Sequence, residues 1–227
     1  MQQPSLGYVR ARLKRGALAL TVVSSAAAAH LASSGFLWAH ETSMQAASAG
    51  AASPRLASSS DNRTSPITGW LIFCHRYPDE CTVDPSQPAV IEMTSAIWQT
   101  VRTINQRVNR SIKAITDQEH WGVGDRWDYP ADGYGDCEDF QLLKRKLLVR
   151  HGLPRRALRM TVVIDDEGLG HAVLMMRTTA GEFVLDNKRD AILPPDQTGY
   201  TYIKREGDTA AAWVSLGEPS PVATANQ

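Results

Sequence analysis

The 227-residue sequence has no excess of charge of either sign, because its basic and acidic residues both number 24. Proteins that hold nucleic acid through its phosphates need a basic surface, and no polybasic arm is present. We therefore expect no nucleic-acid partner. The length fits one compact domain with extensions at its ends, because domains usually contain about 100 to 200 residues.

Histidine pairs at zinc-ligand spacing are missing as well. Structural and catalytic zinc sites are built from cysteine and histidine residues a few positions apart. His75, His120 and His151 have no such neighbour. This pattern favours surface or helix-end positions for the three histidines and argues against a zinc site.

A hydrophobic run long enough to span a membrane is also absent. The most apolar stretch, residues 16 to 29, is interrupted by Ser24 and Ser25 and stops at His30, short of the roughly 20 residues that a spanning helix needs. Four basic residues precede it: Arg10, Arg12, Lys14 and Arg15. A basic start, a short apolar run and small residues after it are typical of a secretory signal, with a membrane anchor as the alternative.

The composition divides the chain into four segments. We predict an export segment at 1–49, a disordered linker at 50–65, one folded domain at 66–217 and a disordered tail at 218–227. The linker is rich in small and polar residues and has little apolar surface to bury, so it is not expected to fold.

Cysteine is scarce, with three residues in the chain. In an exported protein an odd number suggests one disulfide and one remaining thiol. Cys74 and Cys81 are close in sequence, and Pro78 between them can turn the chain, which predicts a bridge between the two. The alternative is a pair of reduced, buried thiols. In either case Cys137 stays unpaired.

The order of the expected elements is helices first and strands second. Apolar residues at helical spacing predict a helix from Val90 to Ile115, and the glycines and prolines between 117 and 135 predict a loop. A second helix should run from Cys137 to Arg150, with Asp136 as its N-cap. Four strands follow: Leu158 to Ile164, His171 to Arg177, Glu182 to Leu185, and Tyr200 to Lys204. This order predicts an α+β fold with an antiparallel sheet.

The location of two further groups of side chains is also predicted from the sequence. The aromatic residues of the predicted loop either line a substrate groove or cover the core; they are Trp121, Trp127, Tyr129 and Tyr134. Lys144 and Arg145 are expected on a solvated face of the second helix.

Cys137 and His171 have the positions that thiol catalysis requires. A helix N-terminus beside an imidazolium can lower a thiol pKa from about 8.5 to between ~3.5 and ~7.5, and Cys137 is expected at such a start. The backbone N–H of Cys137 is also a candidate donor to an oxyanion. His171 opens its strand after a glycine-containing loop, which suits a general base at a sheet end. Without context, each residue could equally be a packed structural one.

Asp186 is the candidate that orients the histidine. If Thr178 to Gly181 form a hairpin loop, Arg177 faces Glu182, and Asp186 then lies diagonally from His171 on the same face of the sheet. Diagonal neighbours are about 7 to 8 Å apart between backbones, within reach of a side-chain hydrogen bond. An acid at this place would fix the imidazole while the other ring nitrogen accepts the thiol proton.

Three ordered motifs carry a family resemblance: Gly-Asp-Cys-Glu-Asp-Phe at 135–140, Gly-His-Ala-Val-Leu at 170–174 and Phe-Val-Leu-Asp-Asn at 183–187. Together they resemble the bacterial transglutaminase-like cysteine proteinases, the LapG-like family, over a stretch from about Gly69 to Trp213. The resemblance implies a papain-like, transglutaminase-like α+β fold. It also implies that Cys137, His171 and Asp186 match the family's catalytic cysteine, histidine and aspartate.

The same resemblance implies calcium. The family's metal ligands are carboxylates that flank the cysteine, and they correspond here to Asp136 and Glu138, with Asp139 as a further candidate; oxygen ligands of this kind suit calcium. The alternative is that these acids only complement the helix dipole. Carboxylates beside a thiolate raise its pKa, a cost that a bound cation would relieve.

The resemblance finally implies a role. LapG-like proteins are periplasmic proteases that cut a large surface adhesin and are sequestered by an inner-membrane receptor, so we expect a periplasmic cysteine endopeptidase with a protein substrate and a thioester acyl-enzyme. Two alternatives remain: transglutaminase-type acyl transfer to an amine, and a catalytically silent adaptor that binds calcium or a receptor.

Overall fold

The computed structural model describes residues 63–208 and 212–217. The predicted export segment (1–49), most of the predicted linker and the predicted tail (218–227) lie outside these ranges. Within them, every helix is too short or too polar to cross a lipid bilayer.

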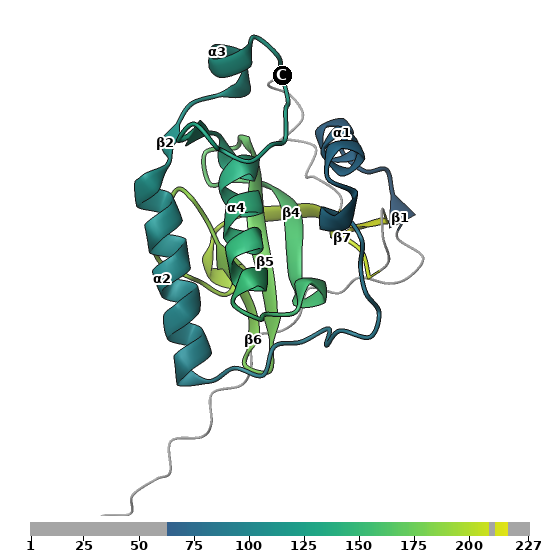
Figure 1. Cartoon of the computed structure of the whole chain (residues 1–227), viewed down its shortest axis with the longest axis vertical. Coiled ribbons are helices and arrows are strands. Elements are labelled where there is room, and N and C mark those ends of the chain that lie inside the picture. Colours follow the sequence, from purple (N-terminus) through teal and green to yellow (C-terminus); the bar gives the residue numbers. More distant parts are fainter. Residues whose placement is uncertain (1–62, 209–211, 218–227) are drawn as a thin grey trace, which may run out of the picture. The chain divides into compact units, whose positions relative to one another are not determined.

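A six-stranded antiparallel sheet is the centre of the fold (Figure 1). Its strands, in spatial order, are β1 (Arg63–Thr64), β8 (Trp213–Ser215), β7 (Thr201–Glu206), β4 (Leu158–Ile164), β5 (Gly170–Thr178) and β6 (Gly181–Leu185). The longest pairings join β4 to β5 and β5 to β6, neighbours in sequence that short turns connect. With helices preceding most of these strands, the predicted α+β fold is confirmed.

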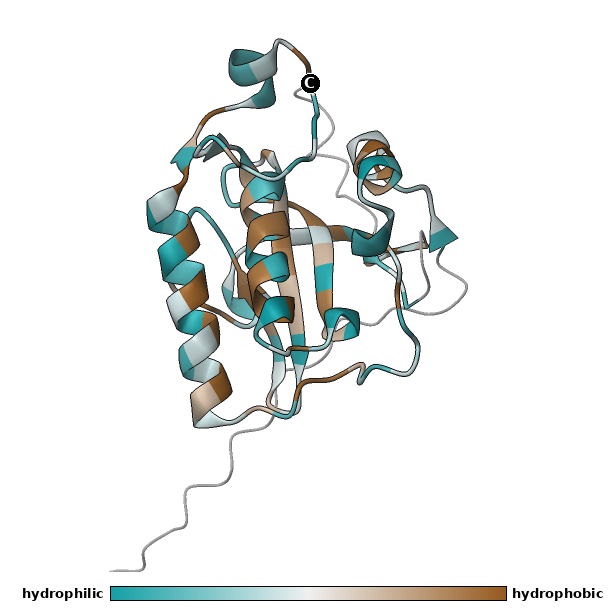
Figure 2. Cartoon of the chain, in the orientation of Figure 1, coloured by the Kyte–Doolittle hydropathy of each residue, from teal (hydrophilic) through white to brown (hydrophobic). Residues whose placement is uncertain are grey.

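Four helices precede the central strands: α1 (Thr68–Arg76), α2 (Ser95–Ser111), α3 (Asp117–Trp121) and α4 (Cys137–Arg150). Three short 3₁₀ turns complete the elements: η1 (Pro78–Glu80), η2 (Arg155–Ala157) and η3 (Pro195–Gln197). Helix α4 packs on β5 and α2 packs on α4, as Figure 1 shows. Figure 2 shows apolar and polar residues sharing the surface of α2, and its buried face includes Val101, Ile104 and Val108.

The first long helix is shorter than its apolar pattern predicts. It begins at Ser95 because the Thr94 side chain caps it, accepting the Ile97 N–H at 3.2 Å. Ile91 instead forms an isolated bridge with Thr178 of β5. The prediction of a helix from Val90 to Ile115 was therefore wrong at both ends, where the backbone is extended and the apolar side chains are buried (Ile91) or partly buried (Ile112).

The segment predicted as a loop, 117–135, contains two elements. Thr116 and Glu119 form a capping box, which starts α3. Tyr134–Gly135 form β3, which pairs in parallel with β2 (Lys113–Ala114). The capping box was readable in the sequence, whereas the β2–β3 pairing depends on contact between two separate segments.

The domain begins earlier than predicted. Arg63 and Thr64, placed in the linker from the sequence, form β1 and pair with Val214 and Trp213 of β8. The correction has a simple physical reason, since a short polar segment can complete a sheet edge through its backbone alone.

Some of the aromatic residues of 117–135 cover the core, and others lie on the surface. Trp127 is 2% exposed and meets the rings of Trp70 and Trp213, and Tyr129 packs on the same core. Trp121 and Tyr134 are exposed. The core explanation holds for the first pair, and the second pair remains on the surface.

The predicted solvated face of α4 is wrong for Lys144 and Arg145, which are 0% and 1% exposed. Arg145 binds Glu206 at 2.7 Å and lies over the ring of Trp70. Lys144 Nζ has no hydrogen-bond partner among residues 63–208 and 212–217. Both are buried because α4 is covered by the sheet and by α2, an arrangement that helical periodicity cannot reveal.

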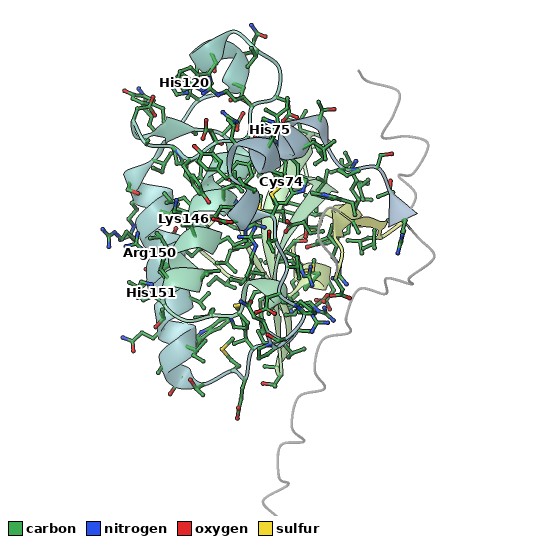
Figure 3. The ribbon with its side chains drawn as sticks, turned by 45° about the vertical axis from the view of Figure 1, so that its right-hand side comes forward. Cys74, His75, His120, Lys146, Arg150 and His151 are labelled. Atoms are coloured by element: carbon green, nitrogen blue, oxygen red, sulfur yellow. A yellow bond between two sulfur atoms is a disulfide. The ribbon has the colours of Figure 1, made fainter. Side chains whose placement is uncertain are left out.

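The remaining residues singled out in the sequence lie at the periphery. Cys74 and Cys81 form a disulfide between α1 and the residue after η1. His75 lies on α1, His120 on α3, and His151 directly after α4, as Figure 3 shows. His120 lies 2.9 Å from the carboxylate of Asp132.

Candidate active site

A pocket of about 250 Å³ lies where the start of α4 meets the start of β5. Its wall contains Cys137, His171 and Trp127, with glycines at 124 and 170. Two of the three residues predicted to act in catalysis therefore share one cavity. The third, Asp186, lies behind His171.

Cys137 is the first residue of α4, as its sequence context predicts. Asp136 occupies the N-cap position with extended backbone, but its side chain makes no capping hydrogen bond. Gly135 permits the tight approach to the helix, because a Cβ there would lie 2.7 Å from the Asp139 carboxylate. The thiol is half-buried.

His171 is placed by the register of β5. Arg177 pairs with Glu182, as predicted, and the hairpin closes at the pair of Thr178 and Gly181. Asp186 follows β6 directly, and its Oδ1 lies 2.8 Å from His171 Nε2. Because Nε2 is engaged by the carboxylate, Nδ1 is the ring nitrogen that remains for a thiol proton.

The Asp186 carboxylate is firmly anchored. Oδ1 also accepts the Lys188 N–H at 3.0 Å, and Oδ2 accepts the hydroxyl of Tyr200 at 2.6 Å. Burial alone would raise the pKa of Asp186, but the hydrogen bonds from His171, Tyr200 and the Lys188 backbone outweigh it and lower the pKa to about 2. The acid is therefore ionised throughout the neutral range. Tyr200 was not among the residues predicted for the site.

The thiol side has the opposite electrostatics. Burial, followed by the charges of Glu138 and Asp136, raises the pKa of Cys137 well above its ordinary value. The thiol donates to Glu138 Oε2 at 3.1 Å, which holds the proton on sulfur. The helix start by itself does not overcome these carboxylates.

Five carboxylates gather beside the thiol in two overlapping groups. Asp117, Asp125 and Glu138 form one group; Asp117, Asp136 and Asp139 form the other, and within each group the ligand atoms lie within 4.8 Å of one another. The predicted ligands Asp136, Glu138 and Asp139 all belong to this cluster. Asp117 and Asp125 were missed because they come from the distant α3 and its following loop.

The cluster is electrostatically unfavourable as it stands. Burial, with repulsion from neighbouring acids, raises the pKa of Asp139 to about 8 and raises the pKa of Asp117 and of Asp125. Asp136 Oδ1 has no hydrogen-bond partner within the described part of the chain. Crowded carboxylates that repel one another, with one buried oxygen that has no donor, fit a hard divalent cation such as calcium.

Four carboxylates of the cluster are also oriented by the backbone. Asp117 accepts the Arg126 N–H, and Asp125 accepts the Gly69 N–H at 3.2 Å. Asp136 accepts the Asp117 N–H at 3.2 Å, and Asp139 accepts the Asp128 N–H at 2.8 Å. Each of these bonds uses a single carboxylate oxygen. Such outer contacts aim acidic ligands in metal sites.

Comparison with known proteins identifies the family of the chain. The family model "bacterial transglutaminase-like cysteine proteinase BTLCP" matches residues 60–220. Calcium-bound Legionella pneumophila LapG is similar in structure, at 23% identity and a TM-score of 0.47 over 55% of this chain and 72% of that one. The EGTA-treated form of the same protein has 26% identity and a TM-score of 0.45, over 52% of this chain and 67% of that one. No curated protein matches the chain. The match over most of the described domain shows that the chain belongs to the bacterial transglutaminase-like cysteine proteinases.

Proposed function

We propose that this cysteine peptidase is an exported endopeptidase in which Cys137 is the nucleophile, His171 the general base and Asp186 the residue that orients the histidine. The observation that carries the proposal is the 2.8 Å hydrogen bond from His171 to Asp186, beside a pocket whose wall also contains Cys137. A base, its orienting acid and a helix-start thiol in one place support acyl transfer.

In the acylation step the Cys137 sulfur forms a bond to the scissile carbonyl carbon, and His171 Nδ1 takes the thiol proton. The Cys137 N–H at the helix start is a candidate donor to the developing oxyanion. When the C–N bond breaks, His171 returns the proton to the leaving amine. A thioester acyl-enzyme and the first peptide product result.

Deacylation repeats the sequence with water. His171 takes a proton from the water, the water oxygen bonds to the acyl carbon, and the C–S bond breaks. The proton goes back to the sulfur, which restores the thiol. Asp186 stabilises the imidazolium during both steps without giving up its own charge.

Calcium is the proposed cofactor, with the five clustered carboxylates as its candidate ligands: Asp117, Asp125, Asp136, Glu138 and Asp139. Bound there, the cation would supply positive charge next to the thiol and offset the carboxylates that raise its pKa. The ligand chemistry supports calcium over softer metals, since every candidate donor is an oxygen.

The location and partners belong to the same proposal. The basic and apolar start of the chain supports export to the periplasm, and the Cys74–Cys81 disulfide suits an oxidising compartment. On the family resemblance we propose a periplasmic or surface protein as substrate, with a large adhesin as the leading candidate. An inner-membrane receptor that sequesters the enzyme is the proposed regulator.

The test uses the full chain exported from an expressing cell, with p-nitrophenyl acetate as an acylating probe. We expect a burst of p-nitrophenol equal to the enzyme concentration, absent in Cys137→Ala and slowed about 10²- to 10⁴-fold in His171→Ala. Chelation of calcium should slow the burst, and added calcium should restore it. Asp132→Asn, outside the pocket, is the control.

The result also separates the competing functions. A thiol no faster than an ordinary cysteine and unaffected by His171→Ala would leave the silent adaptor as the better account. If the burst is present, mass spectrometry of a cleaved protein substrate with an added amine distinguishes hydrolysis, which yields two shorter chains, from transglutamination, which adds the mass of the amine.

A further inference from the structure

One carboxylate oxygen of Asp186 makes a contact that has no role in the proposed mechanism. Its Oδ1 faces His171, while Oδ2 accepts a 2.6 Å hydrogen bond from the Tyr200 hydroxyl. We propose that Tyr200 is a positioning residue of this enzyme, acting on the thiol chemistry through Asp186 and His171. This inference rests on the proposed function.

The geometry explains why a second donor matters. A carboxylate bound through one oxygen can turn about its Cβ–Cγ bond, and the acceptor that faces the imidazole turns with it. The Tyr200 hydroxyl on Oδ2 and the Lys188 N–H on Oδ1 fix both oxygens. Partners of this kind orient the primary groups of active sites and are required for their precision.

Tyr200 is itself held in place. Its hydroxyl oxygen accepts a hydrogen bond from Arg189 Nη2 at 2.9 Å, and the Arg189 guanidinium lies 5.0 Å from the ring centre. The Tyr200 N–H donates to Thr198 Oγ1 at 3.2 Å. The residue is 8% exposed, so its ring has little freedom to leave. A continuous series of contacts thus runs from Arg189 through Tyr200 and Asp186 to His171.

The Tyr200 ring also supports the base directly. It meets the His171 imidazole edge-on, with 5.9 Å between ring centres and 86° between planes. Burial and the neighbouring Asp186 carboxylate raise the pKa of Tyr200 above its ordinary value. The phenol therefore stays protonated and keeps donating to Asp186 at any pH at which the enzyme would work.

A neighbouring tyrosine provides a matched control. Tyr202 has the same 8% exposure, and its hydroxyl lies 3.0 Å from Thr198 Oγ1 and not on the Asp186 carboxylate. Tyr200→Phe and Tyr202→Phe each remove one buried hydroxyl from nearly the same part of the fold. A difference between them therefore reports the contact to Asp186.

The experiment measures acylation of the full exported protein by p-nitrophenyl acetate as a function of probe concentration. Loss of one hydrogen bond to a charged group predicts a limiting acylation rate about 10- to 100-fold lower in Tyr200→Phe. The probe concentration at half-maximal rate should be unchanged, because Tyr200 is not one of the residues that line the pocket. Tyr202→Phe should match the wild type.

A second pair of variants tests whether the effect passes through Asp186. In an Asp186→Ala background, adding Tyr200→Phe should produce no further loss, since the group it positions is gone. Arg189→Gln removes both the contact to the Tyr200 hydroxyl and the guanidinium 3.7 Å from Asp186 Oδ2. It should lower the rate in the same direction, and it tests the anchoring of Asp186 if Tyr200→Phe does not fold.

Three outcomes overturn the inference. Equal rates for Tyr200→Phe and Tyr202→Phe, or a further loss from Tyr200→Phe in the Asp186→Ala background, reject the positioning role while leaving the triad intact. A wild-type protein without a Cys137-dependent burst rejects the proposed function and this inference together.

Discussion

The two sides of the candidate active-site pocket differ in how completely their charges are balanced. On the sheet side, Asp186 has a donor on each oxygen and His171 has a charged partner. On the helix side, the thiol faces Glu138, and five carboxylates gather with raised pKa values among them. In the same cavity, the charges of the sheet side are paired, whereas the carboxylates of the helix side repel one another.

This contrast follows from how each half is built. The sheet side is fixed by strand register and short turns, so its groups are preorganised without any external help. The helix side brings acids together from α3, its following loop and the start of α4, and nothing in the described chain neutralises them fully. We infer that the sheet side is ready for chemistry and that the helix side depends on a cation.

The largest effect should come from breaking the sheet side. Asp186→Asn keeps the shape of the side chain but removes the charge that fixes the imidazole tautomer, and acylation should slow by about 10³- to 10⁴-fold. Burst kinetics with p-nitrophenyl acetate measure it. Asp190→Asn, a nearby and more exposed acid, should retain wild-type rates. A loss of less than tenfold in Asp186→Asn would contradict the role of the acid.

The next effect concerns Lys144, buried near Asp186. Burial lowers the pKa of Lys144 to about 7 from 10.5, so between these values the unfolded chain binds more protons and stability rises with pH. Lys144→Met should raise the free energy of unfolding by an amount on the order of 3 kcal/mol at pH 6. The gain should shrink as the pH approaches 10.

Urea unfolding at a series of pH values measures this change. Arg150→Met is the control on the same helix, because Arg150 is exposed (Figure 3); it should change stability little. A destabilised Lys144→Met protein would mean that the buried ammonium has a stabilising partner.

Binding of a cation to the acids of the helix side should raise the free energy of unfolding by an amount similar to that expected for Lys144→Met. Calcium at about 100 times its dissociation constant should stabilise the fold by about 2.7 kcal/mol. It should also move alkylation of Cys137 to lower pH, because a positive charge favours the thiolate. Thermal unfolding and iodoacetamide kinetics, with calcium and with EGTA, measure the two effects.

The acidic variants decide where the cation binds. Asp139→Asn should abolish most of the calcium-dependent stabilisation, whereas Asp132→Asn should leave it intact. Without calcium, Asp139→Asn should not destabilise the protein, since the carboxylate has a raised pKa of about 8 and its ionisation is unfavourable. An unchanged calcium response in Asp139→Asn would remove this residue from the site.

The smallest effect should come from the disulfide, which supports the helix side indirectly. Arg76 and Tyr77, between the two cysteines, hold Asp128 at 2.7 and 2.9 Å, and the Asp128 N–H binds Asp139. Replacing both cysteines with alanine should cost about 2.5 kcal/mol of stability and weaken calcium binding. Wild type in reductant is the parallel measurement. Unchanged calcium affinity would show that Asp139 does not depend on this loop.

Local signals in the sequence predicted much of the fold. Helix α4 and strand β4 both have the predicted bounds. The pairing of Arg177 with Glu182 also followed from the turn. Each depends on residues adjacent in the chain. The edge strand β1 and its neighbour β8 were missed because they are short and are defined only by their pairing.

The candidate site shows the same division. Cys137, His171 and Asp186 were identified from motifs and register, and three of the five clustered acids flank the cysteine in sequence. Asp117 and Asp125 have no sequence signal that marks them as ligands. Tyr200 likewise has no sequence feature that distinguishes it from other aromatic residues. Each becomes visible only through a contact between distant segments.

The sequence by itself determined the class of protein, the elements with clear caps and periodicity, and the residues proposed for catalysis, because these depend on short-range pattern and side-chain chemistry. Only the tertiary structure decided which charges are buried. It covered Lys144 and Arg145, gathered the acids beside the thiol and placed Tyr200 on Asp186. Burial and convergence are properties of packing between remote segments, and desolvation then sets the electrostatics that the chemistry uses.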